Sequence, residues 1–166
     1  ADHYGPLQLG ITLRPAPVGA REPLLSLGHR NQGQLFTLER TSATQVRIGC
    51  TTSGGAEVWS PPFAWPLDQA QVLTIDAGSL LPPALSGLWP AHVSTAARDI
   101  AQRHLEISLY QTTVWKTDLP LIEVAPSTVT PGRNDVLQTG IAPTIAADIS
   151  SATGRTQIGR ASCRER

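Results

Sequence analysis

The sequence predicts an all-β fold, a sandwich or barrel of antiparallel sheets, from three observations. Short runs alternate between apolar and polar residues, the runs recur about every 10 residues, and turn-forming residues stand between them. Alternation of period two is typical of strands that bury one face and leave the other in water. The 166 residues include 14 Gly and 14 Pro, a share that fits a chain rich in turns better than a disordered one.

The first expected strand is Leu7–Leu13, in which four apolar residues alternate with Gln8, Gly10 and Thr12. Pro15 and Pro17 end it, because proline cannot donate a hydrogen bond to a neighbouring strand. Turns are expected at 30–33, 53–55 and 131–134, where Gly, Asn, Ser and Pro gather. The further expected strands are 25–27, 35–39, 46–50, 71–76, 104–110, 112–119, 121–124 and 144–149.

Two stretches interrupt this rhythm. Residues 60–66 form a rigid, aromatic connection rich in proline, and residues 78–102 form a longer excursion. Within the excursion, Thr95–Arg103 is expected to make two helical turns with Thr95 as the N-cap. Long excursions of this kind often carry function.

The C-terminal end of the sequence differs from the rest. Residues 158–166 resemble one reading frame of a sequencing adapter, so we expect a non-native tail after a single β-sandwich domain of residues 1–157 that is truncated at its C-terminus. Cys163 lies in this tail, which leaves Cys50 without a partner for an internal disulfide. We expect Cys50, on the apolar face of its strand, to behave as a small buried hydrophobe.

Charge argues against several classes of partner. The 13 basic and 13 acidic residues cancel, and residues 1–157 alone carry 10 basic and 12 acidic side chains, a net of −2. Nucleic-acid binding needs a basic excess, so we predict no nucleic-acid partner. Nothing in the sequence indicates a polybasic membrane patch.

The order of the motifs resembles the laminin-G-like, concanavalin A-like jelly roll, over roughly residues 5–150. The segments that carry this resemblance are 5–13, 22–28, 34–39, 46–49, 104–110, 113–115 and 132–134. It implies two antiparallel sheets and a domain of a bacterial envelope or secreted protein. An extracellular, periplasmic or cell-envelope location, and other domains of a longer parent chain as partners, follow from that resemblance.

No catalytic residue is predicted. A glycosidase needs two carboxylates on either side of the scissile bond, and the resembling hydrolases place theirs on one strand as Glu-x-Asp-x-x-Glu, a string absent here. Glu39, Glu57 and Glu106 each stand alone in their segments. A glycoside hydrolase or lyase on the same scaffold remains the alternative, with carboxylates that converge from different strands.

No metal ligand or cofactor is predicted, and calcium is left open. The four His residues are not spaced as zinc ligands. Calcium in laminin-G-like domains uses Asp, Asn and carbonyl oxygens, which Asn134 and Asp135 could supply, although an Asn-Asp turn explains that pair equally well.

Tryptophan gives the best indication of a ligand, because sugars present flat apolar faces on which aromatic rings stack. Trp59 and Trp65 flank the proline-rich connection and Trp89 lies in the long excursion, so all three are predicted to bind ligand. The alternative for each is a plug beneath its own loop, and Trp115 is expected in the core. The leading hypothesis is a non-catalytic binding or accessory module that recognises a glycan or a protein surface; a purely structural domain of a larger membrane-associated protein is a further alternative.

Overall fold

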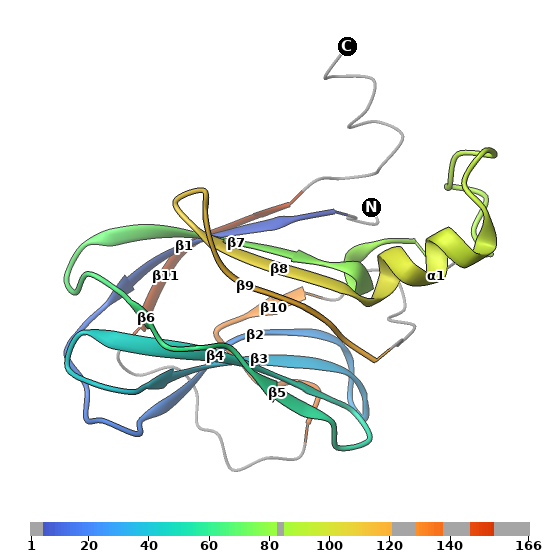
Figure 1. Ribbon diagram of the computed structural model, residues 1–166. Helices are drawn as coiled ribbons and strands as arrows, with labels where there is room; N and C mark the ends of the chain where they lie inside the picture. Colours follow the sequence, from blue (N-terminus) through green and yellow to red (C-terminus); the bar gives the residue numbers. More distant parts are fainter. Residues whose placement is uncertain (1–4, 83–84, 121–128, 138–146, 155–166) are drawn as a thin grey trace.

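The structure is a computed structural model that describes residues 5–82, 85–120, 129–137 and, for the backbone, 147–154. It is an all-β jelly-roll sandwich, as predicted, made of two antiparallel sheets that form the upper and lower layers in Figure 1. Each layer presents one apolar face to the other, because buried apolar residues recur at every second position, as they do in the segments 7–13, 46–50 and 73–77. Three predictions concern residues outside the described ranges: the strand at 121–124, the tail at 158–166 and Cys163 within that tail.

The upper sheet has five strands in the order β11-β1-β7-β8-β9. Their bounds are β1 Leu7–Leu13, β7 Ala70–Ala77, β8 His104–Leu109, β9 Thr112–Asp118 and β11 Ala147–Gly154. The first and last strands of the chain are therefore neighbours, with Leu9 opposite Ala152. The described part of the strand expected at 144–149 lies in β11, which extends to Gly154, and residues 144–146 lie outside the described residues.

The lower sheet has six strands, with β10-β2-β3-β4-β5 in that order and β6 paired to β4. Their bounds are β2 Arg21–His29, β3 Gln32–Arg40, β4 Gln45–Thr52, β5 Glu57–Trp59, β6 Phe63–Ala64 and β10 Val129–Pro131. A bulge in β2 between Pro23 and Leu25 lets both Leu24 and Leu25 lie buried. The sequence indicated neither β10 nor the short β6.

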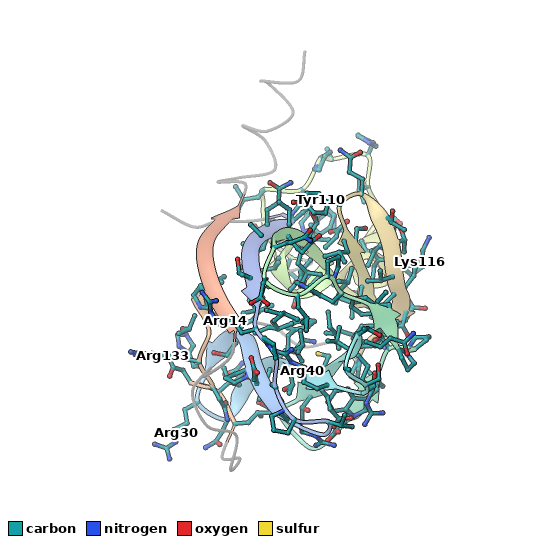
Figure 2. The ribbon with its side chains drawn as sticks, turned by 90° about the vertical axis from the view of Figure 1, so that its left-hand side faces the viewer. Arg14, Arg30, Arg40, Tyr110, Lys116 and Arg133 are labelled. Carbon is teal, nitrogen blue, oxygen red and sulfur yellow. The ribbon has the colours of Figure 1, made fainter. Side chains whose placement is uncertain are left out.

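Between the sheets lies a core of side chains that are almost entirely buried, including Leu9, Ile11, Phe36, Ile48 and Ile107. Figure 2 shows side chains filling the space between the two layers. A polar contact also bridges the layers, since the Ser79 hydroxyl donates to Gln34 Oε1 at 2.7 Å from the turn after β7. Burial of these apolar side chains is the main force that holds the two sheets together.

The long excursion forms an arm at one end of the upper sheet (Figure 1). It contains the 3₁₀ helix η1 (Gly78–Leu80) and the helix α1 (Thr95–Arg103), whose range matches the prediction. The predicted N-cap was wrong by one residue, because the Ser94 hydroxyl accepts a hydrogen bond from the Ala97 N–H at 3.1 Å. The helix ends against Gly78, where a Cβ would come within 2.3 Å of the Ala101 carbonyl oxygen. No helix in the described ranges is long and apolar enough to cross a membrane.

One ion pair lies inside the sandwich. The Arg40 guanidinium is 3.5 Å from Glu22 Oε1, and both side chains are at most 5% exposed. Figure 2 shows Arg40 within the molecule, whereas Arg30 and Arg133 point outward. Glu22 and Arg40 project from adjacent strands of the lower sheet, at positions that alternate with outward-facing residues. A buried charge is tolerated only when it is paired, so each of these side chains depends on the other.

We expect Arg40→Ala to lower the free energy of unfolding by about 3–5 kcal/mol, because it removes one charge of a buried ion pair. Chemical denaturation followed by circular dichroism measures this. Arg14→Ala is the matched control, since Arg14 and Asp68 are 3.7 Å apart with side chains more than half exposed, and a change below about 0.5 kcal/mol is expected there. Equal effects of the two substitutions would contradict a structural role for the Glu22–Arg40 pair.

Candidate functional site

The structure does not bring the three predicted tryptophans together. Trp65 is 1% exposed and belongs to the core, with its ring centroid 6.2 Å from that of Phe63. A side chain this deeply buried offers no surface to a ligand, so the prediction of a ligand contact for Trp65 was wrong. Trp115, expected in the core, is 7% exposed and does lie there.

Trp89 is fastened within the arm. Its indole Nε1 donates to the Pro82 carbonyl oxygen at 3.0 Å, and the Arg98 guanidinium lies 5.7 Å from the ring centroid. Gln102 of α1 donates to the same carbonyl at 2.7 Å. These contacts tie the loop to the helix and give Trp89 a structural role, while a ligand contact for this partly exposed residue stays a prediction.

Trp59 lies on the outer face of the lower sheet. Its neighbour Val58 packs against the core, so Trp59 points the opposite way. Trp59 is the register partner of Gly49 in β4, and its indole lies directly over that glycine. A Cβ on Gly49 would come within 2.6 Å of the ring. The absence of a side chain at residue 49 is therefore what lets a large aromatic ring lie against the sheet.

Two arginines flank this ring. The guanidinium carbons of Arg21 and Arg47 lie 5.0 Å and 4.2 Å from the centroid of the Trp59 ring. Both arginines donate through Nε to one carboxylate, that of Glu39, which stands between them in the register of β2, β3 and β4. Glu57 accepts a hydrogen bond from the Trp59 Nε1. We call these five residues, Arg21, Glu39, Arg47, Glu57 and Trp59, the Trp59 cluster.

Glu39 is the charge that organises the Trp59 cluster. Burial acts to raise the pKa of Glu39, but the hydrogen bonds and positive charges of Arg47 and Arg21 outweigh it and lower the pKa below its ordinary value. The carboxylate is therefore ionised at neutral pH and holds both guanidinium groups beside the ring. The cluster thus combines a flat apolar ring with fixed hydrogen-bond donors and acceptors.

The outer face of the upper sheet carries a different set of charges. Asp76 and Glu106 are register partners on β7 and β8, and Lys116 stands opposite Glu106 on β9. Glu106 accepts a hydrogen bond from the Thr113 hydroxyl at 2.8 Å and lies 3.6 Å from His104 Nε2. Two carboxylates from different strands are thus adjacent, in the manner that the hydrolase alternative requires.

Asn134 does not present a calcium ligand. Its side-chain oxygen accepts hydrogen bonds from the backbone N–H groups of Val136 and Leu137, at 3.3 Å and 2.9 Å, which makes it part of a turn. Within the described part of the chain, no group of three or more His, Cys, Asp or Glu side chains could hold a metal ion. A turn thus accounts for Asn134, and calcium binding stays an untested prediction.

Cys50 is buried with a free thiol, as expected. Burial raises its pKa to about 12, so the thiol stays protonated and unreactive at neutral pH. Cys50 is accordingly a core residue and no part of the Trp59 cluster.

The chain resembles solved structures of sandwich domains. It aligns with a heptameric SAP-like pentraxin from Limulus polyphemus with a TM-score of 0.53 and 9% identity, covering 92% of this chain and 62% of the pentraxin. It thus spans less than two thirds of that protein. The CBM40 module of the Ruminococcus gnavus IT-sialidase, solved with α2,3-sialyllactose, gives a TM-score of 0.47 at 15% identity, over 91% of this chain and 79% of the module. The same module with α2,6-sialyllactose gives 0.48 at 16% identity, over 91% and 80%.

No protein-family model and no curated protein matches the sequence. At such low identity the pentraxin likeness establishes the jelly-roll fold and nothing further. Function must therefore be argued from the side chains that this chain itself displays.

The position of Trp59 can be tested through Gly49. We expect Gly49→Ala to push the indole off the sheet, because the added methyl group cannot share the space of a ring within 2.6 Å. The measurement is the Trp emission spectrum. Gly49→Ala should shift the spectrum of the native protein to the red. The same substitution in a Trp59→Phe background should leave the emission spectrum unchanged. An unchanged spectrum in the native background would contradict the placement of Trp59 over Gly49.

The ion pairs of Glu39 predict a pH dependence. Because the folded-state pKa of Glu39 lies below its ordinary value of 4.5, its ionised form stabilises the fold above that pH, and the contribution is lost as the pH falls through the folded-state pKa. Glu39→Gln should therefore cost about 1 kcal/mol at pH 7, and this difference from the native protein should shrink in acid. Urea unfolding at a series of pH values measures it; a difference that stays constant into acid would refute the ionic contribution.

Proposed function

We propose that this protein is a non-catalytic glycan-binding module of the laminin-G-like kind, from a bacterial envelope or secreted protein, and that it binds through the Trp59 cluster. The observation that carries this proposal is the placement of a partly exposed indole on the outer face of a sheet, between two arginines and two glutamates. Aromatic rings bordered by hydrogen-bonding groups are suited to sugars, which are apolar on their faces and polar around their edges.

The Trp59 cluster is also arranged in advance. Glu39 fixes Arg21 and Arg47, Glu57 fixes the indole Nε1, and Gly49 fixes the distance of the ring from the sheet. A ligand therefore has few side chains left to order when it binds, which lowers the entropic cost. Strands also position a site more firmly than loops do.

The hydrolase alternative rests on Asp76 and Glu106. Their adjacency on the upper sheet supplies two carboxylates, but Glu106 is engaged by Thr113 and lies beside Lys116 and His104. Among the residues whose side chains are described, the exposed aromatic ring of this sheet is that of Tyr110, in the turn after β8, where its hydroxyl bonds the Ala70 carbonyl oxygen. We therefore favour binding over catalysis, and Glu106→Gln should leave glycan binding unchanged.

The direct test is isothermal titration of the protein with lactose, sialyllactose, cellotetraose and trigalacturonate. We expect at least one to bind saturably, and Trp59→Ala to weaken that binding about tenfold or more, as loss of an aromatic anchor does. Tyr110→Ala is the matched control, because Tyr110 is a 55% exposed aromatic residue on the other sheet. Circular dichroism checks that each variant folds.

Two outcomes would overturn the proposal. One is that no glycan binds the native protein; the other is that Trp59→Ala binds as tightly as the native protein does. In either case the Trp59 cluster would be a structural network, and the module would act as a structural or protein-binding domain.

A further inference from the structure

We infer that the glycan recognised by the Trp59 cluster is acidic, and that its carboxylate is bound by Arg21 and Arg47 together. The inference rests on the proposed function and names the class of ligand for that site. Three observations support it: Glu39 occupies only the Nε atoms of the two arginines, both arginines are partly exposed, and Glu57 lies at the Nε1 edge of the indole.

Glu39 leaves most of the donors of the two arginines available. Arg21 and Arg47 each donate to its carboxylate through Nε. In the described part of the chain, the terminal Nη groups of these two arginines donate to no other acceptor. Each guanidinium carries five N–H donors in a planar fork that suits a carboxylate. The pair therefore offers several charged donors in fixed positions beside an aromatic ring.

The charges over the face of the ring that reach the solvent are mainly positive. The Arg21 and Arg47 side chains are 46% and 31% exposed, whereas Glu39 between them is 13% exposed. The four charged side chains of the Trp59 cluster sum to zero, but the two guanidinium groups share the largely covered Glu39, while Glu57 bonds the indole Nε1. A second anion, supplied by the ligand, would complete the pairing.

Glu57 determines how an acidic sugar would be oriented in the site. It is exposed and lies at the Nε1 edge of the indole, whereas the arginines approach the ring from β2 and β4. A carboxylate would be repelled near Glu57 and attracted near the arginines, while a sugar hydroxyl could donate to Glu57. An acidic sugar with its carboxylate toward Arg21 and Arg47, and hydroxyl groups toward Glu57, satisfies both ends.

Glu39 offers little to a neutral sugar, because its side chain is only 13% exposed. Its two carboxylate oxygens already accept from the two arginines, one from each. Its role is to position the guanidinium groups, and the recognition falls to their remaining donors. A neutral sugar would give these remaining guanidinium donors no charged acceptor and would gain only neutral hydrogen bonds and stacking.

The test compares ligands that differ only in their acid. Sialyllactose and trigalacturonate are each titrated against their own methyl ester, so that the two pairs separate the two sources of a sugar carboxylate. We expect the acid of at least one pair to bind about tenfold more tightly than its neutral counterpart, and the preference to fall as NaCl is raised from about 50 to 500 mM.

Arg21→Gln and Arg47→Gln should each weaken binding of the acid far more than binding of its neutral counterpart, and so remove most of that preference. Arg14→Gln is the matched control, because Arg14 is an exposed arginine paired with Asp68 after β1, and it should preserve the preference. Circular dichroism and a denaturation curve confirm that each variant is folded before it is titrated.

The outcomes separate this inference from the function on which it rests. Equal binding of acid and neutral glycans, abolished by Trp59→Ala, would overturn the acidic ligand and keep the glycan-binding module. An acid preference that survives both Arg21→Gln and Arg47→Gln would place the carboxylate elsewhere and also overturn the inference. Absence of binding by every glycan would overturn both.

Discussion

The rest of the structure depends on the burial of two apolar sheet faces against each other. Each long strand places alternate residues in this shared core, and the side chains between them are left on the outer faces of the sandwich. Leu38 and Ile48 are core residues, and for that reason Glu39, Arg47 and Gly49 face outward. The Trp59 cluster is in this sense a by-product of core packing: once the inner faces are fixed, the register of β2, β3 and β4 sets its members side by side.

Glycines and buried charges adjust this arrangement where packing alone would fail. Gly49 lets Trp59 lie on the lower sheet, Gly78 lets α1 end against the upper one, and Gly33 admits the Val136 side chain at distances no Cβ would tolerate. The Glu22–Arg40 pair shows the opposite device, in which two charges occupy the edge of the core and hold adjacent strands in one register. The glycines let neighbouring segments approach closely. The Glu22–Arg40 pair disfavours any shift in the register of β2 and β3 that would separate the two charges.

Sequence patterns predicted what depends on neighbouring residues and missed what depends on distant ones. Alternation was enough for β1, β7 and β8, and the range of α1 was correct because the residues that form it are consecutive, although its N-cap was placed one residue too late. The turn at Tyr110 and Gln111 has positive φ at both residues without Gly or Asn; the Tyr110 hydroxyl, bonded to the Ala70 carbonyl oxygen, helps to hold it. Trp59 could be named from the sequence, but its partners Arg21, Glu39 and Arg47 could not, because the register that joins them spans three strands. For the same reason, the sequence alone could not show whether the Trp65 side chain is buried or exposed.

The distribution of charge also changes what net charge implies. A chain that is neutral as a whole is poorly suited to an extended polyanion, which requires many cations on one surface. The fold, however, separates its charges by face: Asp76, Glu106 and Asp118 lie on the outer side of the upper sheet with Lys116 and His104, whereas Arg21 and Arg47 flank an aromatic ring on the lower one. Recognition of one anionic group needs only a few positively charged donors that are held in place on one side of a site. In the Trp59 cluster the two guanidinium groups share the covered Glu39 carboxylate, and Glu57 bonds the indole Nε1 instead. Near-zero net charge and selective binding of an acidic sugar are therefore compatible properties of the same sequence.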